Sequence, residues 1–474
     1  MSSESSKAPG ARTRTYAEEL AGFAVSTGWE GIPEEVRAKV RAHVLDSFGV
    51  ALASAGEPFG RSLLRSVREL GTGGSCGVIG SGVRLPAAWA ALVNGTLVHG
   101  LDFDDTHQEA VLHVSSGVLP AALASAEETG ADGRAFVRAL ALGMETAIRV
   151  ALVAPGAFHD RGFHPTGICN VFGAVVAGGL LHGLSAEKLA AALGLAGSQA
   201  GGLLEFLSDG SDVKRLHGGW AAHSGLVAVR LAGSGFSGPR EVFEGRFGFY
   251  RAYLGGEAYR AERLVEGLGE RWHVLETALK PYPCCHYLHA FLDAALGLRR
   301  AEGFHAGRIV RVECSVPERE IPVICEPEPG KKKPRTPYDA KFSLPYTLAC
   351  MLVRGHVDLD DFREEAIRER SVLEVASRVA YRPAGDMGFP RRFGGRIRVE
   401  LADGRILEAE EATNRGSPER PLSAREVEEK FFRNAGRTLP PAASEKLARA
   451  IAELDTLPRA GELALLSQKD GTAS

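Results

Sequence analysis

Ten residues, from Val98 to His107, concentrate side chains that can move protons. They include two histidines, three aspartates and a threonine, and they follow an apolar segment. If a helix continues through them, His99, Asp102, Thr106 and His113 share one face, because residues three, four and seven apart do so. A base or acid, an orienting carboxylate and a hydroxyl would then form one wall. Proton-transfer enzymes need such groups close together and partly shielded from water.

Two more segments place cationic or titratable groups beside glycines. His164 is followed by a proline, which favours extended backbone before a helix that we expect to start near Gly167. Free N–H groups at that helix start could hold an anion, although a plain capping turn explains the same pattern. Lys214, Arg215 and His217 lie in a glycine-bounded turn before an apolar helix. This arrangement suits a carboxylate ligand, and the alternative is a solvated loop.

Two segments nearer the C-terminus also carry lysines. Two prolines fix the backbone that leads from Lys280 towards a helix start at His289. Between them, Cys284 and Cys285 are more typical of buried small hydrophobes than of nucleophiles. Lys341 precedes another apolar helix. It either contributes to a site or extends its amine from the helix end into solvent.

Composition excludes several classes of function. The net charge is −3, which argues against a nucleic-acid or membrane-surface partner. Seven cysteines without a CxxC pair favour neither a disulfide framework nor a zinc ribbon. Phosphate-binding, dinucleotide-binding and nucleophile-elbow glycine motifs are missing from the sequence. A metal site would need ligands such as His99, Asp102, Asp105 and His107, which show no recognised ligand spacing. We therefore expect no metal and no cofactor, and acid–base chemistry on an anionic small molecule.

Apolar periodicity predicts a mainly α protein, with a large all-helical domain over residues 16–269. Helical runs at 36–53, 136–153, 186–196 and 220–232 are apolar nearly all round, as buried helices are. The polar residues 1–15 predict a disordered leader rather than a signal peptide. No segment is long and apolar enough to span a bilayer. We therefore expect a soluble, cytoplasmic protein.

The pattern changes after residue 270, and residues 270–410 predict a smaller α+β domain. Runs at 308–316 and 396–401 alternate with period two, and Asp403-Gly404 predicts a hairpin turn before 406–407. Helices are expected at 289–300 and 346–353, and an exposed loop at 331–333. Residues 411–474 predict helices at 423–436, with Ser423 and Glu426 as a capping box, and at 445–454. We expect these helices to return to the first domain.

Six motifs in order resemble the MmgE/PrpD family, which includes 2-methylcitrate dehydratases, cis-aconitate decarboxylases and an iminodisuccinate epimerase. They span residues 16–455 and read HGLDFDDTH, GFHPTGICNVFGA, DGSDVKRLHGGWAAHSGL, FEGRFGFY, KPYPCCHYLHAFLDA and DAKFSLPY. The resemblance implies a helical domain with a smaller α+β lid, a homodimer, and catalysis without metal or organic cofactor in the cleft between the domains. Carried over to this sequence, the catalytic residues are Asp102, Thr106, His113, His164, Lys214 and Lys280. His107, His217, Cys285, His286 and Lys341 are expected to contact the substrate.

One position departs from the decarboxylases of that family. They have a histidine five residues after the junction lysine, where this chain has Cys285 followed by His286. We therefore expect a hydro-lyase that removes a proton α to a carbonyl or carboxylate and eliminates a β-hydroxyl as water. The alternatives are decarboxylation of a cis-aconitate-like acid, epimerisation or isomerisation, and dehydration followed by Michael-type addition within a larger metabolite. A non-catalytic binding protein is a further alternative, because fold alone does not establish function.

Overall fold

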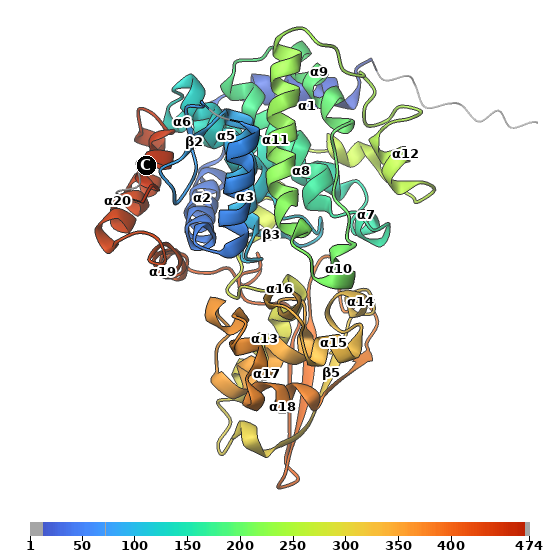
Figure 1. Ribbon diagram of the computed structural model, residues 1–474. Helices are drawn as coiled ribbons and strands as arrows, with labels where there is room; N and C mark the ends of the chain where they lie inside the picture. The colour runs from blue at the N-terminus through green and yellow to red at the C-terminus, as the bar shows by residue number, and fades with distance from the viewer. Residues whose placement is uncertain (1–12, 72, 470–474) are drawn as a thin grey trace, which may run out of the picture.

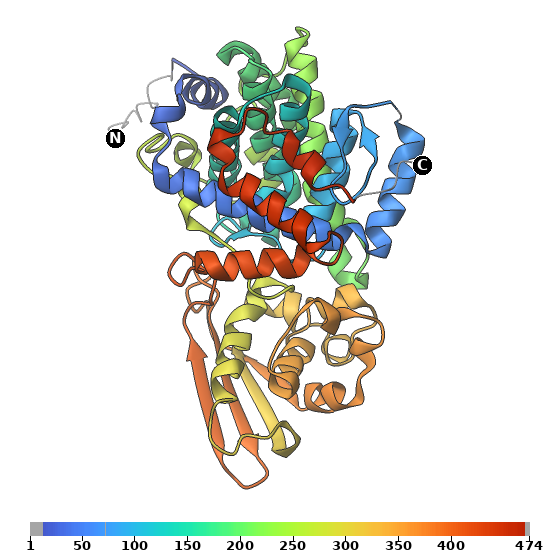
Figure 2. The same ribbon diagram turned by 90° about the vertical axis from the view of Figure 1, so that its left-hand side faces the viewer.

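A computed structural model describes residues 13–71 and 73–469 of this chain, and it is mainly α-helical, as the sequence predicts. Two bodies lie one above the other (Figure 1). Helices α1–α12 form the helical body, and α13–α18 with strands β5–β8 form the sheet body. Helices α19–α21 return to the helical body, where α19 and α20 pack against α2 and α21 packs against α20 and β1 (Figure 2). Most of the predicted leader, residues 1–15, lies outside the described residues.

The helical body is built from long, apolar helices. Its helices are α1 (Tyr16–Ser26), α2 (Glu34–Ala55), α3 (Pro58–Leu70), α4 (Ala87–His99), α5 (Ser115–Thr129), α6 (Gly133–Leu152), α7 (Ala157–Asp160), α8 (Pro165–Leu181), α9 (Ala186–Gly197), α10 (Phe206–Asp209), α11 (Val213–Gly233) and α12 (Phe249–Leu254). Alanine, glycine and valine let α5, α6 and α8 be buried on almost every face, as the sequence predicts for the run at 136–153 that forms most of α6. Two short antiparallel pairs, which the sequence did not predict, join β1 (Cys76–Gly77) to β2 (Arg84–Leu85) and β3 (Thr106–His107) to β4 (Thr277–Ala278).

Glycines allow α4 and α11 to cross at very short range. A Cβ added to Gly95 would lie 2.6 Å from the Cα of Gly219, so only glycine fits at this crossing. The crossing brings the last turn of α4, which carries His99, towards the first turns of α11, which carry Lys214 and His217. Small residues in two helices far apart in sequence therefore position polar residues of one site.

The sheet body contains a four-stranded sheet with the order β6-β5-β7-β8. Its elements are α13 (His289–Leu298), β5 (Ile309–Val316), α14 (Ile321–Ile324), α15 (Glu328–Lys332), α16 (Pro337–Ala340), α17 (Leu344–Arg354), α18 (Arg370–Ser377), β6 (Val379–Pro383), β7 (Gly395–Leu401) and β8 (Ile406–Glu411). The hairpin predicted at Asp403-Gly404 is confirmed, and Gly404 has the positive φ of 82° that such a turn requires. Helix α13 packs against β7 and β8.

Three C-terminal helices complete the fold: α19 (Ala424–Ala435), α20 (Pro441–Ala452) and α21 (Glu462–Leu466). The predicted capping box is present at the start of α19, where Ser423 and Glu426 satisfy each other's backbone N–H groups. Phe431, Leu447 and Leu463 join the core of the helical body. No helix among the described residues has the length and apolarity needed to cross a membrane.

Three local predictions were wrong. Lys214, Arg215 and His217 lie in the first turns of α11, which begins at Val213, and not in a turn before the helix. The helix through residues 98–107 is not formed, because α4 ends at His99 and Asp102 adopts a positive φ of 53° before the chain extends into β3. The exposed loop at 331–333 is also not observed: Lys331 lies in α15 and is 2% exposed. Its amine donates hydrogen bonds to the carbonyl oxygens of Val323 (2.8 Å) and Phe342 (2.9 Å), which replace the water it gives up.

Candidate active site

A small cavity lies where the two bodies meet. Nine lining residues come from the helical body: Thr106, Val111, His113, His159, His164, Leu204, Phe206, Leu207 and Lys214. Six come from the other side of the junction: Cys285, His286, Tyr287, Val323, Phe342 and Phe393. The volume is about 40 Å³, room for a few water molecules. A ligand larger than a few water molecules fits this cavity only if its walls separate.

Asp102 joins two lysines at the back of the cavity. The Lys214 amine donates a hydrogen bond to Oδ1 of Asp102, and the Lys280 amine lies 3.3 Å from Oδ2 and 3.0 Å from the Asp102 carbonyl oxygen. Burial alone would raise the pKa of Asp102, but the two ammonium groups outweigh it and hold this pKa well below its usual range. Lys280 is fully buried and does not line the cavity. Of the triad Lys214, Asp102 and Lys280, only Lys214 therefore lines the cavity.

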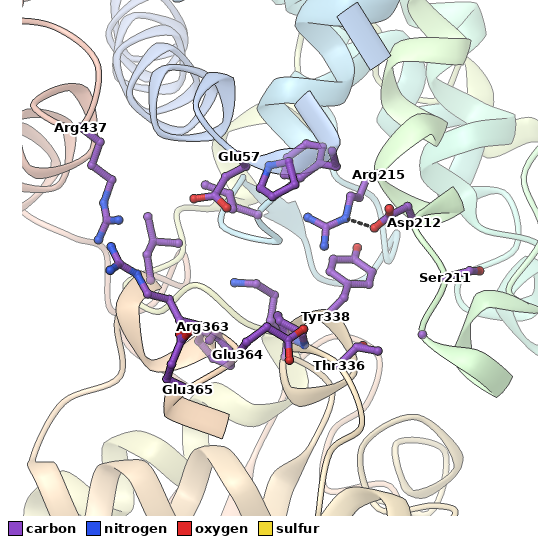
Figure 3. A pocket seen from close by; sticks show the side chains of 18 residues that line it. Glu57, Ser211, Asp212, Arg215, Thr336, Tyr338, Arg363, Glu364, Glu365 and Arg437 are labelled. Carbon is purple, nitrogen blue, oxygen red and sulfur yellow. Dashed lines mark hydrogen bonds and ion pairs between the residues drawn. The ribbon is translucent and has the colours of Figure 1, made fainter. Parts of the chain in front are cut away.

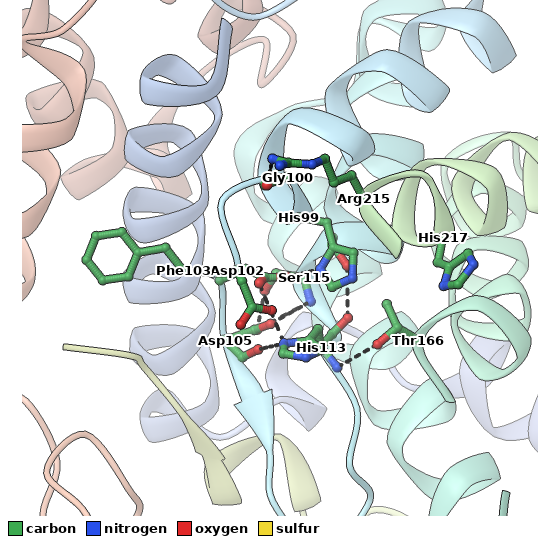
Figure 4. A network of polar contacts seen from close by, with 12 residues as sticks. His99, Gly100, Asp102, Phe103, Asp105, His113, Ser115, Thr166, Arg215 and His217 are labelled. Carbon is green, nitrogen blue, oxygen red and sulfur yellow. Dashed lines mark hydrogen bonds and ion pairs between the residues drawn. The ribbon is translucent and has the colours of Figure 1, made fainter. Parts of the chain in front are cut away.

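His113 is held in one tautomer by backbone contacts (Figure 4). Its ring Nδ1 donates to the carbonyl oxygen of Asp105 at 2.7 Å, and its backbone N–H donates to Thr166 Oγ1 at 3.2 Å. Thr106 Oγ1 lies 3.3 Å from the same Nδ1. The proton on Nδ1 leaves Nε2 as the basic nitrogen. Burial, together with Lys280 and Lys214, lowers the pKa of His113 well below its usual range, so the ring is neutral near pH 7.

His164 and His217 form a second histidine unit. Their Nδ1 atoms are 2.9 Å apart, so one ring donates to the other and the two neutral rings have opposite tautomers. Burial, the neighbouring His217 and Lys214 lower the pKa of His164. His164 ends the chain segment before α8 and lines the cavity, while His217 supports it from α11. A proton on this pair can be exchanged between the two rings.

His99 connects the two histidine units. Its ring lies 4.9 Å from that of His113 and 5.5 Å from that of His164, and its Nδ1 pairs with Asp104 at 2.7 Å. His99, Asp104 and His113 bring ligand-type atoms within 4.8 Å of one another. However, the ring nitrogens that face Asp104 carry hydrogens in the bonds described above, and an N–H cannot bind a metal. The group therefore fits proton transfer better than metal ligation.

The metal ligands considered from the sequence do not converge. Asp105 accepts from Ser115 and pairs with Nδ1 of His43 at 2.8 Å. His107 points away from the cavity, because neighbouring residues of a strand alternate in direction and Thr106 faces it. Its Nε2 lies 3.8 Å from Glu276, on a separate surface pocket. His107, predicted to contact substrate, therefore lies on the opposite side of β3.

Other predicted residues divide between two pockets. Cys285 and His286 line the histidine cavity, and burial raises the pKa of the Cys285 thiol to about 12, which keeps it protonated. Lys341 is 3% exposed, donates to the Pro283 carbonyl oxygen at 2.7 Å, and lines a separate groove of about 640 Å³. Arg215 faces the same groove, stacked on Tyr338 at 3.9 Å (Figure 3). Lys341 therefore does not extend from its helix into solvent.

The sequence analysis did not predict nine of the fifteen residues that line the cavity, among them His159 and Val111. His159 lines the cavity five positions before His164, and burial lowers its pKa to about 4. Val111 has a positive φ of 50°, rare for a β-branched residue, and its side chain closes one wall. No spacing in the sequence marks either residue, because His159 lies in the short helix α7 and Val111 lies in a turn after β3.

Comparison with known proteins identifies the family. The model of the MmgE/PrpD N-terminal domain matches residues 18–262, and that of the MmgE/PrpD C-terminal domain matches residues 282–456. The chain belongs to the MmgE/PrpD family. This MmgE/PrpD protein is 28% identical to a cis-aconitate decarboxylase-like protein of Aspergillus oryzae, covering 92% of this chain and 93% of that protein. It is 27% identical to a cis-aconitate decarboxylase of Aspergillus terreus (86% and 85% covered) and 30% identical to the human one (79% and 78%).

Proposed function

We propose that this protein is a cofactor-independent lyase that removes a proton α to a carbonyl or carboxylate and eliminates a β-hydroxyl as water. The observation that carries the proposal is that His113, neutral and held in one tautomer, lines the same cavity as the Lys214 amine. A neutral imidazole can accept the α-proton, and the nearby ammonium group stabilises the negative charge that develops on the substrate. Both groups are shielded from bulk water, which strengthens the electrostatic effect.

Each remaining residue has a proposed part in this reaction. Thr106 positions the substrate beside His113, which becomes an imidazolium when it accepts the α-proton and then gives a proton to the leaving hydroxyl. His164, held by its hydrogen bond to His217, orients that hydroxyl. Asp102 and Lys280 hold the Lys214 amine in place. Cys285 and His286 shape the opposite wall. Positioned acid–base groups typically contribute about 10²–10⁴-fold each.

Decarboxylation is the second candidate, because the named relatives include cis-aconitate decarboxylases. In that reaction Lys214 would bind the retained carboxylate, and a proton would be added to the carbon that loses carbon dioxide. The protonated Cys285 thiol is a weak acid for this step, since its pKa is raised to about 12. We therefore rank dehydration first.

Proton NMR of the purified enzyme in deuterated water, with a panel of hydroxy acids and unsaturated acids, tests the proposal. New vinyl signals indicate dehydration, release of carbon dioxide indicates decarboxylation, and α-deuteration alone indicates an epimerase or isomerase. Lys214→Met should abolish turnover in a folded protein, whereas Arg230→Met, an exposed cation at the far end of the same helix, should not. Full activity in Lys214→Met would refute the assignment.

We also propose that the protein is a homodimer. The support is the outward face of α11, where Val213, Trp220 and Leu231 are exposed apolar side chains. Light scattering after gel filtration should give twice the chain mass. The mass of a single chain would contradict the proposal.

A further inference from the structure

A groove lies at the junction of the two bodies, apart from the histidine cavity (Figure 3). Its volume is about 640 Å³, which is the size of pockets that hold small organic molecules. Phe59 and Arg215 line it from the helical body, and Tyr338, Lys341 and Phe362 line it from the sheet body. A molecule bound in this groove would therefore contact both bodies.

The groove and the cavity lie on different sides of the same two chain segments. At the start of α11, Lys214 lines the cavity and its neighbour Arg215 lines the groove. Before α17, Phe342 lines the cavity and its neighbour Lys341 lines the groove. Ligands of the two spaces would therefore meet different side chains, so mutations can separate the loss of one site from the loss of the other.

The amine of Lys341 is buried at the groove without a carboxylate partner among the described residues. Lys341 is 3% exposed, and its amine donates to the Pro283 carbonyl oxygen at 2.7 Å and lies 4.1 Å from the centre of the Phe362 ring. An ammonium group carries three N–H donors, so two of them have no acceptor in the described part of the chain. A buried ammonium group without a counter-ion is costly, and an anion in the groove would supply one.

The charged groups around Lys341 also favour an anion in the groove. Burial lowers the pKa of Lys341 to about 7, and repulsion from Arg215 and Lys280 contributes to this shift. Asp102 and Cys284 oppose the shift but do not cancel it. The amine is therefore partly uncharged near pH 7, and a bound anion would restore its charge.

Arg215 is held in place before any ligand binds. Its guanidinium carbon lies 4.3 Å from the centre of the Phe59 ring and 3.9 Å from that of the Tyr338 ring. Its Nε donates to Asp212 Oδ1 at 2.8 Å, and its Nη1 donates to the Gly100 carbonyl oxygen. Its Nη2 has no hydrogen-bond partner within residues 13–71 and 73–469. A fixed donor loses little conformational entropy on binding, which favours recognition of a planar carboxylate.

We propose that the groove is a second ligand site, distinct from the catalytic cavity, which binds a small carboxylate with an apolar body. The carboxylate would accept hydrogen bonds from Lys341 and Arg215, and the apolar body would pack against Leu101 and Leu359. The side chain of Asp212, at the rim, is 72% exposed, so water and salt screen its repulsion of the ligand. The proposal does not depend on the lyase function.

Isothermal titration calorimetry of the full chain with 3-phenylpropanoate and the neutral 3-phenylpropanamide tests the proposal. The carboxylate should bind at least about tenfold more tightly than the amide, because hydrogen bonds to a charged acceptor are the stronger ones. Lys341→Met should lower the affinity for the carboxylate by at least about tenfold. Lys331→Met is the matched control, because Lys331 is a similarly buried lysine of the same body that lines neither the groove nor the cavity. Lys331→Met and Lys214→Met should leave this affinity unchanged.

Proton uptake on binding gives a second measurement, which needs no variant. Titrations at pH 7 in two buffers with different ionisation enthalpies should show an uptake of roughly half a proton per carboxylate bound. The reason is that about half of the Lys341 amines are uncharged before binding, since their pKa is about 7, and the bound anion raises this pKa. The amide should cause no uptake in the wild type, and the carboxylate should cause none in Lys341→Met.

The proposal is overturned if the carboxylate does not bind, if the amide binds as tightly, or if binding of the carboxylate takes up no proton. It is also overturned if Lys214→Met abolishes binding, because the carboxylate would then occupy the cavity. Equal weakening of binding by Lys331→Met and Lys341→Met would overturn it as well, because the effect would then come from the loss of any buried lysine.

Discussion

Replacing Asp102 by asparagine should destabilise the protein strongly, because it leaves Lys214 and Lys280 buried without their carboxylate. At the observed 3.3 Å between Lys280 Nζ and Asp102 Oδ2, the Coulomb attraction is about 5 kcal/mol for an effective dielectric constant of roughly 20. The cost of dehydrating the ions offsets part of this attraction in the intact protein. Removing one partner of a buried pair nevertheless costs about 3–5 kcal/mol, since the remaining charge stays buried. We expect the free energy of unfolding to fall by that amount.

The pH dependence of this loss has a definite sign. The pKa of Asp102 is lower in the folded protein than its usual value of 3.8. The carboxylate therefore contributes its full stability above about pH 4, and the contribution is lost as the pH falls through the folded-state pKa. Urea unfolding should give a constant difference between wild type and Asp102→Asn from pH 5 to 7.5, and a smaller difference only below pH 4.

An exposed ion pair provides the matched control. Asp160 and Arg319 form a pair whose side chains are 53% and 38% exposed, so Asp160→Asn should cost only about 0–1 kcal/mol. Adding Lys280→Met to Asp102→Asn removes one of the two unpaired lysines. The double variant should therefore be more stable than the sum of the single changes predicts. A loss below 1 kcal/mol in Asp102→Asn would refute the energetic coupling of the triad.

Three further outcomes follow from the same structure. Gly219→Ala should lower the free energy of unfolding, measured with urea, by about 1–3 kcal/mol, because its Cβ would lie 2.1 Å from the Leu92 carbonyl oxygen. Gly256→Ala is the control, because the space around Gly256 is open. The pH profile of kcat/KM should lack an acidic limb near pH 6.5, since the pKa of His113 is lowered, and a limb there would argue against His113 as the base. Burial lowers the pKa of Lys341 to about 7, so the folded state binds fewer protons than the unfolded state between pH 7 and 10.5. Stability relative to Lys341→Met should therefore rise with pH across this range, and a flat difference would contradict the burial argument.

Much of the site could be predicted because its residues lie in short motifs. Asp102, Thr106, His113, His164, Lys214, Cys285 and His286 come together within or beside one cavity. The prediction that one helix groups His99, Asp102, Thr106 and His113 on a shared face was wrong. The helix ends at His99, and the positive φ of Asp102 redirects the chain. Helical periodicity describes apolar faces well, but it carries no information about a strained turn whose geometry is imposed by its surroundings.

The amino-acid sequence by itself determined the mainly α class, the alternation that marks β5, β7 and β8, and the family to which the chain belongs. These features depend on local patterns of apolar and polar residues, which one stretch of chain contains in full. The tertiary structure decided which side chains share a cavity. Lys280 reaches Asp102 across 178 positions, while His107 and Lys341 lie on other surfaces despite standing in the same motifs. Partners and burial also set the charge of each group, so the net charge of the site emerges only when the two bodies meet.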